Sequence, residues 1–147
     1  MNLPKICLLA IGIALILVAI GCSEGRYERA LEEYDKAIEL DPTDAGAYYD
    51  RAIGYRYLGE DQLALKDLDK ALELDSKLAK AYTDRGIIRQ GLGQYVEGIQ
   101  DYDRAIALDP ADAKAYYNRS ISYGKLAKYE NMKADKAKAC SLDSEYC

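Results

Sequence analysis

Carboxylates, tyrosines and arginines are the side chains of this sequence that could do chemistry, because several other reactive types are absent. The 147 residues include 25 Asp+Glu, 20 Lys+Arg and 14 Tyr, but no His, no Trp and no Phe. Without histidine, the chain lacks the usual general base, triad partner and imidazole ligand for zinc. A net charge of −5 also argues against a general nucleic-acid binder, which needs a basic surface for the phosphates. We therefore expect a non-catalytic binding module without metal or cofactor.

A period of 34 residues organises most of the chain. Residues 27–44 match the second half of a unit, and three whole units align without gaps over residues 45–78, 79–112 and 113–146. Counted from the first residue of each unit, column four is always tyrosine and column seven is always arginine. The sequence therefore indicates half a repeat followed by three whole repeats.

This period resembles the tetratricopeptide repeat (TPR), a helix-turn-helix with the pattern W-x2-L-G-x2-Y, then A-x3-F and a closing Pro. Small residues at columns eight and twenty would let the two helices approach, and Gly59 and Gly93 stand at the turn between them. The resemblance implies an all-α TPR solenoid, a right-handed superhelix of antiparallel helix pairs. We expect a lone helix B over residues 27–40 and three A/B pairs, the last of them a C-terminal capping unit.

The capping unit is expected to have a polar outer face, because no further unit covers it. The lysines of that face are Lys133, Lys136 and Lys138. A basic docking helix is the alternative interpretation of these lysines.

Arginine in column seven is matched by an acidic residue in column twenty-three of every unit. Opposite charges on two packed helices are most simply interhelical ion pairs that fix the register of the helices. The predicted structural ion pairs involve Arg51, Arg85, Arg119, Glu33, Asp67, Asp101 and Asp135.

TPR arrays bind peptides or partner helices along a concave surface, formed by columns two, five, six, nine, twelve and thirteen of the A helices. By this resemblance, tyrosines, isoleucines and mixed charges line that surface, a combination typical of protein interfaces. The predicted residues of the concave surface are Tyr49, Asp50, Ile53, Arg56, Tyr57, Lys80, Thr83, Asp84, Ile87, Gln90, Lys114, Tyr117, Asn118, Ile121 and Lys125.

One TPR variant grips a C-terminal carboxylate through a clamp of Lys, Asn and Arg side chains on three A helices. Here Tyr49 and Ile53 occupy the first two columns of that clamp, Asp84 replaces an Asn and Asn118 replaces the Arg, so that only Lys114 matches. A ligand carboxylate that faced Asp84 would be repelled. We therefore expect no binding of a chaperone-type tail.

The first segment is interpreted as an address rather than as part of the fold. Residues 6–20 are fifteen consecutive apolar residues, which is the length of a signal-peptide core and short for a membrane-spanning helix. The run ends in A-I-G-C-S at residues 19–23, which resembles a bacterial lipobox. This resemblance implies cleavage before Cys22 and lipidation of that cysteine by a diacylglycerol and palmitate.

The expected order is thus a lipoprotein signal peptide over residues 1–21, a short tether over residues 22–26, and the repeats. The repeat domain would lie outside the cytoplasm, lipid-anchored in the bacterial cell envelope, and Ser23 favours the outer membrane if the cell is Gram-negative. An uncleaved anchor over residues 3–22 is the alternative. Both interpretations export the repeats.

Cys140 and Cys147 are the remaining cysteines of the exported part. Two thiols in an oxidising compartment suggest a disulfide that closes a loop of about eight residues, worth roughly 2 kcal/mol on the chain-entropy model. A redox enzyme is disfavoured because the CxxC spacing is absent.

The predicted function is a protein-protein interaction adaptor at the membrane, which binds a peptide or a helix of an envelope partner. The unpaired first helix leaves a flank for a second docking contact or a homodimer. One alternative is a TPR domain on an uncleaved anchor that serves homo-oligomerisation. Another is an envelope enzyme that uses Asp/Glu pairs, although no pair of acids stands out from the repeat.

Overall fold

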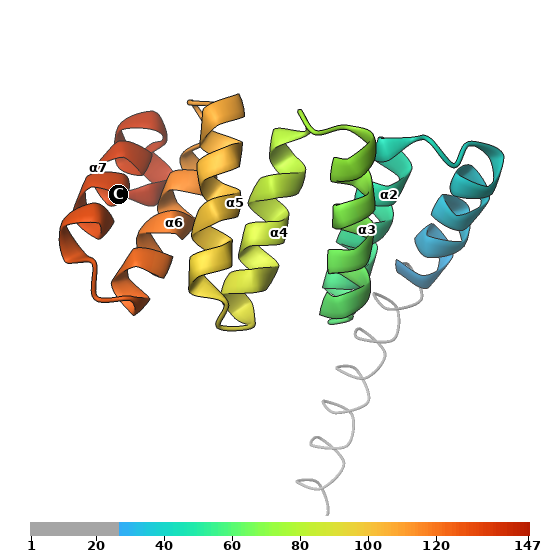
Figure 1. Ribbon diagram of the computed structural model, residues 1–147, viewed down its shortest axis with the longest axis horizontal. Helices are drawn as coiled ribbons and strands as arrows, with labels where there is room; N and C mark the ends of the chain where they lie inside the picture. Colours follow the sequence, from blue (N-terminus) through green and yellow to red (C-terminus); the bar gives the residue numbers. More distant parts are fainter. Residues whose placement is uncertain (1–26) are drawn as a thin grey trace, which may run out of the picture.

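The computed structural model describes residues 27–147, which form an array of antiparallel α-helices (Figure 1). The first helix covers residues 27–40. The elements that follow are α2 (Ala45–Tyr57), α3 (Asp61–Leu74), α4 (Ala79–Gly91), α5 (Tyr95–Leu108), α6 (Ala113–Lys125), α7 (Tyr129–Leu142) and the 3-10 turn η1 (Ser144–Tyr146). No strand occurs in this part of the chain. The prediction of an all-α TPR solenoid is confirmed, whereas the leader, the tether and Cys22 lie outside the described residues.

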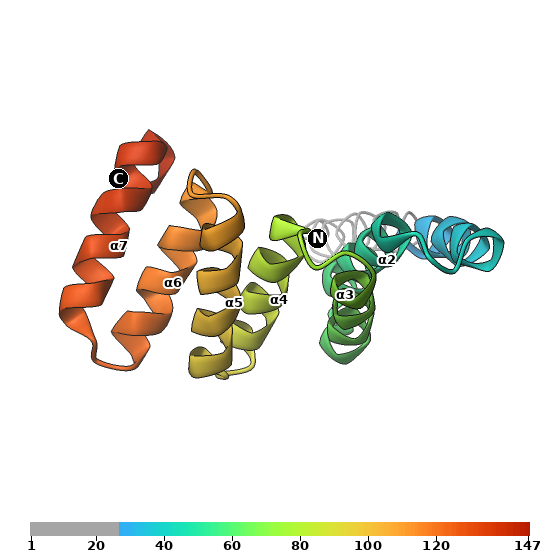
Figure 2. The same ribbon diagram turned by 45° about the horizontal axis from the view of Figure 1, so that its top comes forward.

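The helices follow one another along the long axis of the molecule. The helix at residues 27–40 lies at one end and α7 at the other, and α4 lies between α3 and α5 in both views (Figures 1 and 2). Helices α2, α4 and α6 are the A helices of the three pairs, and α3, α5 and α7 are their B helices.

The turns repeat the period of the sequence. After each B helix, an aspartate Oδ1 accepts a hydrogen bond from the backbone N–H two residues later, at 2.9 to 3.0 Å; these aspartates are Asp41, Asp75, Asp109 and Asp143. Between helices A and B, Gly59 and Gly93 adopt positive φ values of 78° and 77°. Ala127 takes the same place in the last unit with a φ of 55°, a conformation that disfavours any residue with a Cβ.

Helices A and B of a pair approach through residues of matched size. Ala52 and Leu68 are fully buried in one core cluster. In the next unit, a Cβ added to Gly86 would lie 2.6 Å from Cε1 of Tyr102, so the larger ring on α5 requires the glycine on α4. The last unit has Lys136 in the column of Leu68 and Tyr102, and this lysine is exposed. Lys133 and Lys138, the other lysines predicted for the polar outer face, are exposed as well.

Candidate functional site

Asp84 is one of the residues predicted for the concave surface, and it gathers side chains from all three A helices. Its carboxylate accepts a hydrogen bond from Tyr49 Oη at 2.7 Å and forms ion pairs with Arg56 Nη1 at 3.2 Å and Lys114 Nζ at 3.0 Å. The ammonium of Lys80 lies 4.0 Å from the centroid of the Tyr49 ring, which is cation–π distance. The structure thus brings together five of the predicted residues, contributed by α2, α4 and α6.

The burial of Asp84 corrects the expectation that its charge would repel a ligand. Asp84 is only 4% exposed, and a buried carboxylate needs partners that compensate its charge. Tyr49, Arg56 and Lys114 supply that compensation, because each donates to it. The charge of Asp84 therefore stabilises the contact between repeats and does not face a ligand.

Tyr49 acts as a neutral hydrogen-bond donor in this cluster. Burial, and then the hydrogen bond to Asp84, raise the pKa of Tyr49 far above its ordinary value. Its hydroxyl therefore keeps its proton at any pH near neutrality.

Isoleucines at one column of the three A helices form an aliphatic stripe in the repeat pattern. Column nine is isoleucine in all three A helices, and each of these side chains is half-buried: Ile53, Ile87 and Ile121. Exposed polar residues flank the stripe at Asp50, Lys80, Lys114 and Lys125. Tyr57 is 58% exposed, and its ring stacks on that of Tyr27 at 4.8 Å between centroids. The concave surface thus combines apolar contact area with a charged rim, as protein-binding surfaces do.

Two predicted contact residues instead hold the repeats together. Thr83 is 3% exposed, and its hydroxyl donates to Asp112 Oδ2 at 2.7 Å. Gln90 Oε1 accepts hydrogen bonds from Tyr102 Oη at 2.9 Å and Ser122 Oγ at 3.1 Å. The prediction of Thr83 as a peptide contact is therefore wrong, because its side chain is buried, and the carbonyl oxygen of Gln90 is already engaged.

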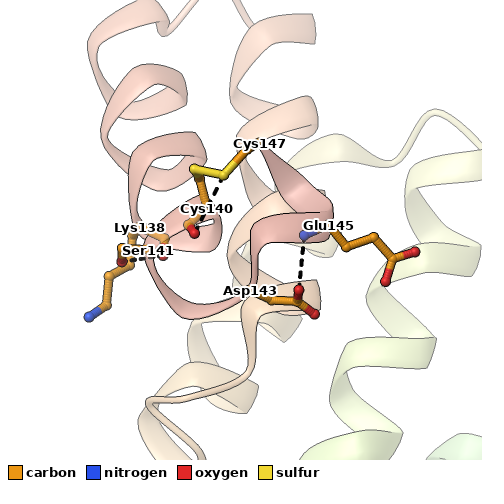
Figure 3. Close-up of a disulfide and its surroundings, with 6 residues drawn as sticks. All are labelled: Lys138, Cys140, Ser141, Asp143, Glu145 and Cys147. Atoms are coloured by element: carbon orange, nitrogen blue, oxygen red, sulfur yellow. Dashed lines mark hydrogen bonds between the residues drawn. A yellow bond between two sulfur atoms is a disulfide. The ribbon is translucent and has the colours of Figure 1, made fainter.

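The C-terminal turn lies against the α6 end of the concave surface. A disulfide joins Cys140 to Cys147, with the Cα atoms 4.6 Å apart, and so ties η1 back to α7 (Figure 3). The ring of Tyr146 lies 4.9 Å from the ring of Tyr117, and Asn118 Nδ2 donates to a backbone carbonyl of its own helix at 2.8 Å. The C-terminal segment therefore covers part of Tyr117.

Each column-seven arginine bridges three helices. Arg51 Nε donates to Asp67 at 2.6 Å within its own pair, while its Nη1 ion-pairs with Asp35 of the preceding helix at 2.7 Å. The same double contact recurs for Arg85 with Asp101 and Asp69, and for Arg119 with Asp135 and Asp103. Hydrogen bonds to the carboxylates raise the pKa of Arg51 above its already high ordinary value. The arginines therefore fix both the pair and the stacking of one pair on the next.

The preceding-helix partners were not predicted, although the sequence carries their signal. Asp35, Asp69 and Asp103 all occupy column twenty-five, 34 residues apart. Glu33, by contrast, was predicted to form a structural ion pair, and this is wrong: it is exposed and forms no ion pair within residues 27–147. The repeat pattern puts an arginine sixteen positions upstream of each paired aspartate of column twenty-three, but sixteen positions upstream of Glu33 the sequence has Leu17, which has no charge.

Residues 27–147 lack two features that would point to other functions. No group of three or more Cys, Asp or Glu side chains there is arranged to hold a metal ion. None of the helices in this range is both long and apolar enough to traverse a bilayer.

Comparison with known families assigns the fold. A family model described as TPR repeat matches residues 20–53 and 91–126, and a model described as tetratricopeptide repeat matches residues 113–146. Arrays of such helix pairs are protein-interaction scaffolds. The chain belongs to the tetratricopeptide repeat family.

Several solved structures are similar, whereas no curated protein sequence matches the chain. MamA (residues 41 to the end) of Desulfovibrio magneticus RS-1 is 25% identical with a TM-score of 0.76, over 98% of this chain and 79% of that chain. PilF of Pseudomonas aeruginosa is 26% identical with a TM-score of 0.76, over 89% and 60% of the two chains. The second TPR domain of Spaghetti (RPAP3), bound to the HSP90 peptide SRMEEVD, has 24% identity and a TM-score of 0.66, over 67% and 92%.

Proposed function

We propose that this TPR protein is a non-catalytic adaptor that holds a peptide or a helix of an envelope protein against its concave surface. The observation that carries the proposal is that α2, α4 and α6 each place a half-buried isoleucine in the same column, with exposed lysines on α4 and α6. The Asp84 cluster supports it, because contacts among all three A helices hold this surface in one shape before a ligand arrives. A TPR domain of similar fold is known with a bound peptide, so the fold is suited to this role.

The charges of the concave surface indicate the chemistry of the partner segment. The predicted concave surface carries four cations and two carboxylates: Arg56, Lys80, Lys114 and Lys125 against Asp50 and Asp84. Of the two carboxylates, Asp84 is buried and paired. A segment with aliphatic side chains for the isoleucines and acidic side chains for the lysines complements this surface.

A lipid on Cys22 would keep the adaptor at the membrane. Residues 23–26 would then separate the anchor from the helix at residues 27–40, a reach of about 15 Å for an extended chain. The repeats would therefore meet partners that are embedded in, or attached to, the same bilayer.

Site-specific photo-crosslinking in cells tests the adaptor role. A benzophenone amino acid at Asp50 or Lys125 lies on the concave surface, and one at the exposed Lys66 of α3 is the matched control. We expect both concave positions to give the same covalent adduct and Lys66 to give none. Equal adducts from all three positions, or an adduct with a second copy of the chain, would contradict a peptide-binding adaptor.

Metabolic labelling with palmitate tests the tether. The unsubstituted chain should take up the label, and the Cys22→Ala variant should lose it, because the thiol that would carry the lipid is gone. An unsubstituted chain that stays in the membrane without label would instead favour the uncleaved anchor.

A further inference from the structure

The second repeat carries a pocket on the side of α4 opposite to the concave surface. Columns four, seven and eleven of an A helix share one face, and the columns of the concave surface lie about 180° away at 100° per residue. The pocket has a volume of about 620 Å³, and we name it the arginine pocket after the three arginines among its lining residues, which include Tyr82, Arg85, Arg89, Asp101, Asp103 and Arg104. An adjoining hollow of about 320 Å³, which reaches Ser76 beyond the end of α3, shares Tyr82 and Arg104 with it.

The second unit departs from the repeat pattern at this pocket. Column eleven is the tyrosine of the family pattern, and it is Tyr55 in the first unit and Tyr123 in the third, but Arg89 in the second. The guanidinium of Arg51 accordingly lies beside two rings, 5.6 Å from Tyr48 and 5.9 Å from Tyr55. The third unit repeats this arrangement at 5.4 Å and 5.8 Å.

Arg85 has only one such ring, because Tyr82 lies 5.4 Å from its guanidinium and Arg89 replaces the second ring. The ring that covers the equivalent arginine in the flanking units is therefore missing in the second unit. An arginine side chain that points to Asp101 stands in its place.

The carboxylates at this pocket are already paired. Asp101 is 2% exposed and accepts from Arg85 Nη2 at 2.6 Å and from Arg89 Nη1 at 2.8 Å. Asp103, which also lines the pocket, accepts from Arg119 Nη1 at 2.5 Å. Each carboxylate of the pocket therefore has an arginine partner that offsets its charge.

Donors remain available on two arginines. Arg89 uses only Nη1 in a hydrogen bond, which leaves Nε and Nη2. Arg104 is exposed and forms no hydrogen bond or ion pair with any residue between 27 and 147. Two guanidinium groups with open N–H donors at one hollow are the arrangement that holds oxyanions in proteins, because the planar fork matches a pair of oxygens.

We propose that the arginine pocket is a binding site for a small molecule that carries an oxyanion, either a phosphate or a carboxylate, held by Arg89 and Arg104. Its volume lies within the range of about 300 to 1,000 Å³ of small-molecule sites. Its charged lining selects a polar anion over an apolar ligand. The site is separate from the concave surface, so the chain could carry a small anion and a partner protein at the same time.

Isothermal titration calorimetry of the purified protein in a phosphate-free buffer tests the site, with inorganic phosphate and succinate as separate probes. Arg89→Tyr copies the residue of the flanking units and should fill the pocket without loss of thermal stability. Arg104→Gln removes an exposed side chain that has no partner in residues 27–147. We expect each variant to weaken binding at least about tenfold, the effect of one charge-assisted hydrogen bond.

Lys66→Gln, at an exposed side chain of α3, is the control, and its affinity for the anion should equal that of the unsubstituted chain. A preference for phosphate or for succinate identifies the source of the oxyanion. The proposal is overturned if neither probe binds at about 10 mM, because a Kd above that concentration is too weak for a specific site. Unchanged affinity in Arg104→Gln, or equal losses in Lys66→Gln and Arg89→Tyr, would overturn it as well.

Discussion

At the scale of single residues, the turn between helices A and B requires glycine for its backbone conformation and not for lack of space. Gly59 and Gly93 have no atom within 4 Å of a Cβ added to them, so space does not demand glycine there. Their φ values of 78° and 77° do, because the left-handed region penalises a Cβ. Ala127 accepts that penalty in the last unit.

Replacement of Ala127 by glycine should therefore stabilise the protein. The expected gain is about 1 kcal/mol, the cost of a non-glycine residue in the left-handed region. Gly93→Ala should lose a similar amount, although both changes are made in open space. Urea unfolding followed by circular dichroism measures the two differences.

Gly91→Ala is the control for that experiment. Gly91 is the last residue of α4, it does not have a positive φ, and no neighbouring atom lies within 4 Å of a Cβ added to it. Alanine there should be neutral or slightly stabilising. A loss at Gly91 as large as that at Gly93 would show that the backbone conformation is not the cause.

At the scale of the helix pair, the two carboxylates that share one arginine are unequal. The side chain of Asp67 is 5% exposed, whereas that of Asp35 is 53% exposed, yet Arg51 contacts them at 2.6 Å and 2.7 Å. Distance alone would rank the two contacts as equal. Burial ranks them differently, because removal of a buried partner leaves the other charge uncompensated.

We expect Asp67→Ala to lower the free energy of unfolding by about 3 kcal/mol. Asp35→Ala should cost less than about 1 kcal/mol, since a solvated ion pair contributes little. Urea unfolding curves of the two variants test the ranking. Equal losses, or a larger loss for Asp35→Ala, would refute a ranking by burial.

The ion pairs also show how far the sequence alone could go. Columns seven and twenty-three lie in one unit, so the pairing of Arg51 with Asp67 could be predicted from the alignment of units. The contact of Arg51 with Asp35 joins two units, and it becomes predictable only if column twenty-five is compared with the arginine of the following unit.

The burial of Asp84 had no such signal. Its partners Arg56 and Lys114 stand in columns twelve and two, and neither column is charged in every unit. Column twelve has Gln90 and Gly124 in the other units, and column two has Gly46 in the first unit. A contact that occurs once cannot be seen in a periodic pattern. The same reason applies to the arginine pocket, because its lining residue Arg89 breaks the pattern of column eleven in the second unit.

At the scale of the whole molecule, each unit is stable only against its neighbours, as in solenoids generally. Among residues 27–147, the largest fully buried side chain is Tyr102 in the middle of the array; it is 0% exposed, and its hydroxyl donates to Gln90 at 2.9 Å. Gln90 also accepts from Ser122 of the next unit. Loss of the contacts of Tyr102 should therefore destabilise both the second and the third unit.

Alkaline pH affects this part of the molecule through the titration of the Tyr102 hydroxyl. Burial, and then the nearby charges of Asp101 and Asp84, raise the pKa of Tyr102 above the ordinary value near 10. The folded state then holds the phenolic proton more tightly than the unfolded state does. The stability that depends on the neutral phenol is complete below pH 10 and is lost as the pH rises beyond it.

The free energy of unfolding of the Tyr102→Phe variant should consequently depend less on alkaline pH. At neutral pH the variant should lose about 1 kcal/mol with the hydrogen bond to Gln90. Above pH 10 its free energy of unfolding should fall less steeply than that of the unsubstituted chain, by up to about 1.4 kcal/mol per pH unit, because one titrating group is gone. Urea unfolding between pH 7 and about pH 11 measures both effects.

Tyr129→Phe, at a side chain that is 58% exposed, is the control and should leave the slope unchanged. Equal slopes for Tyr102→Phe and the unsubstituted chain would mean that the middle of the solenoid opens to water before Tyr102 ionises.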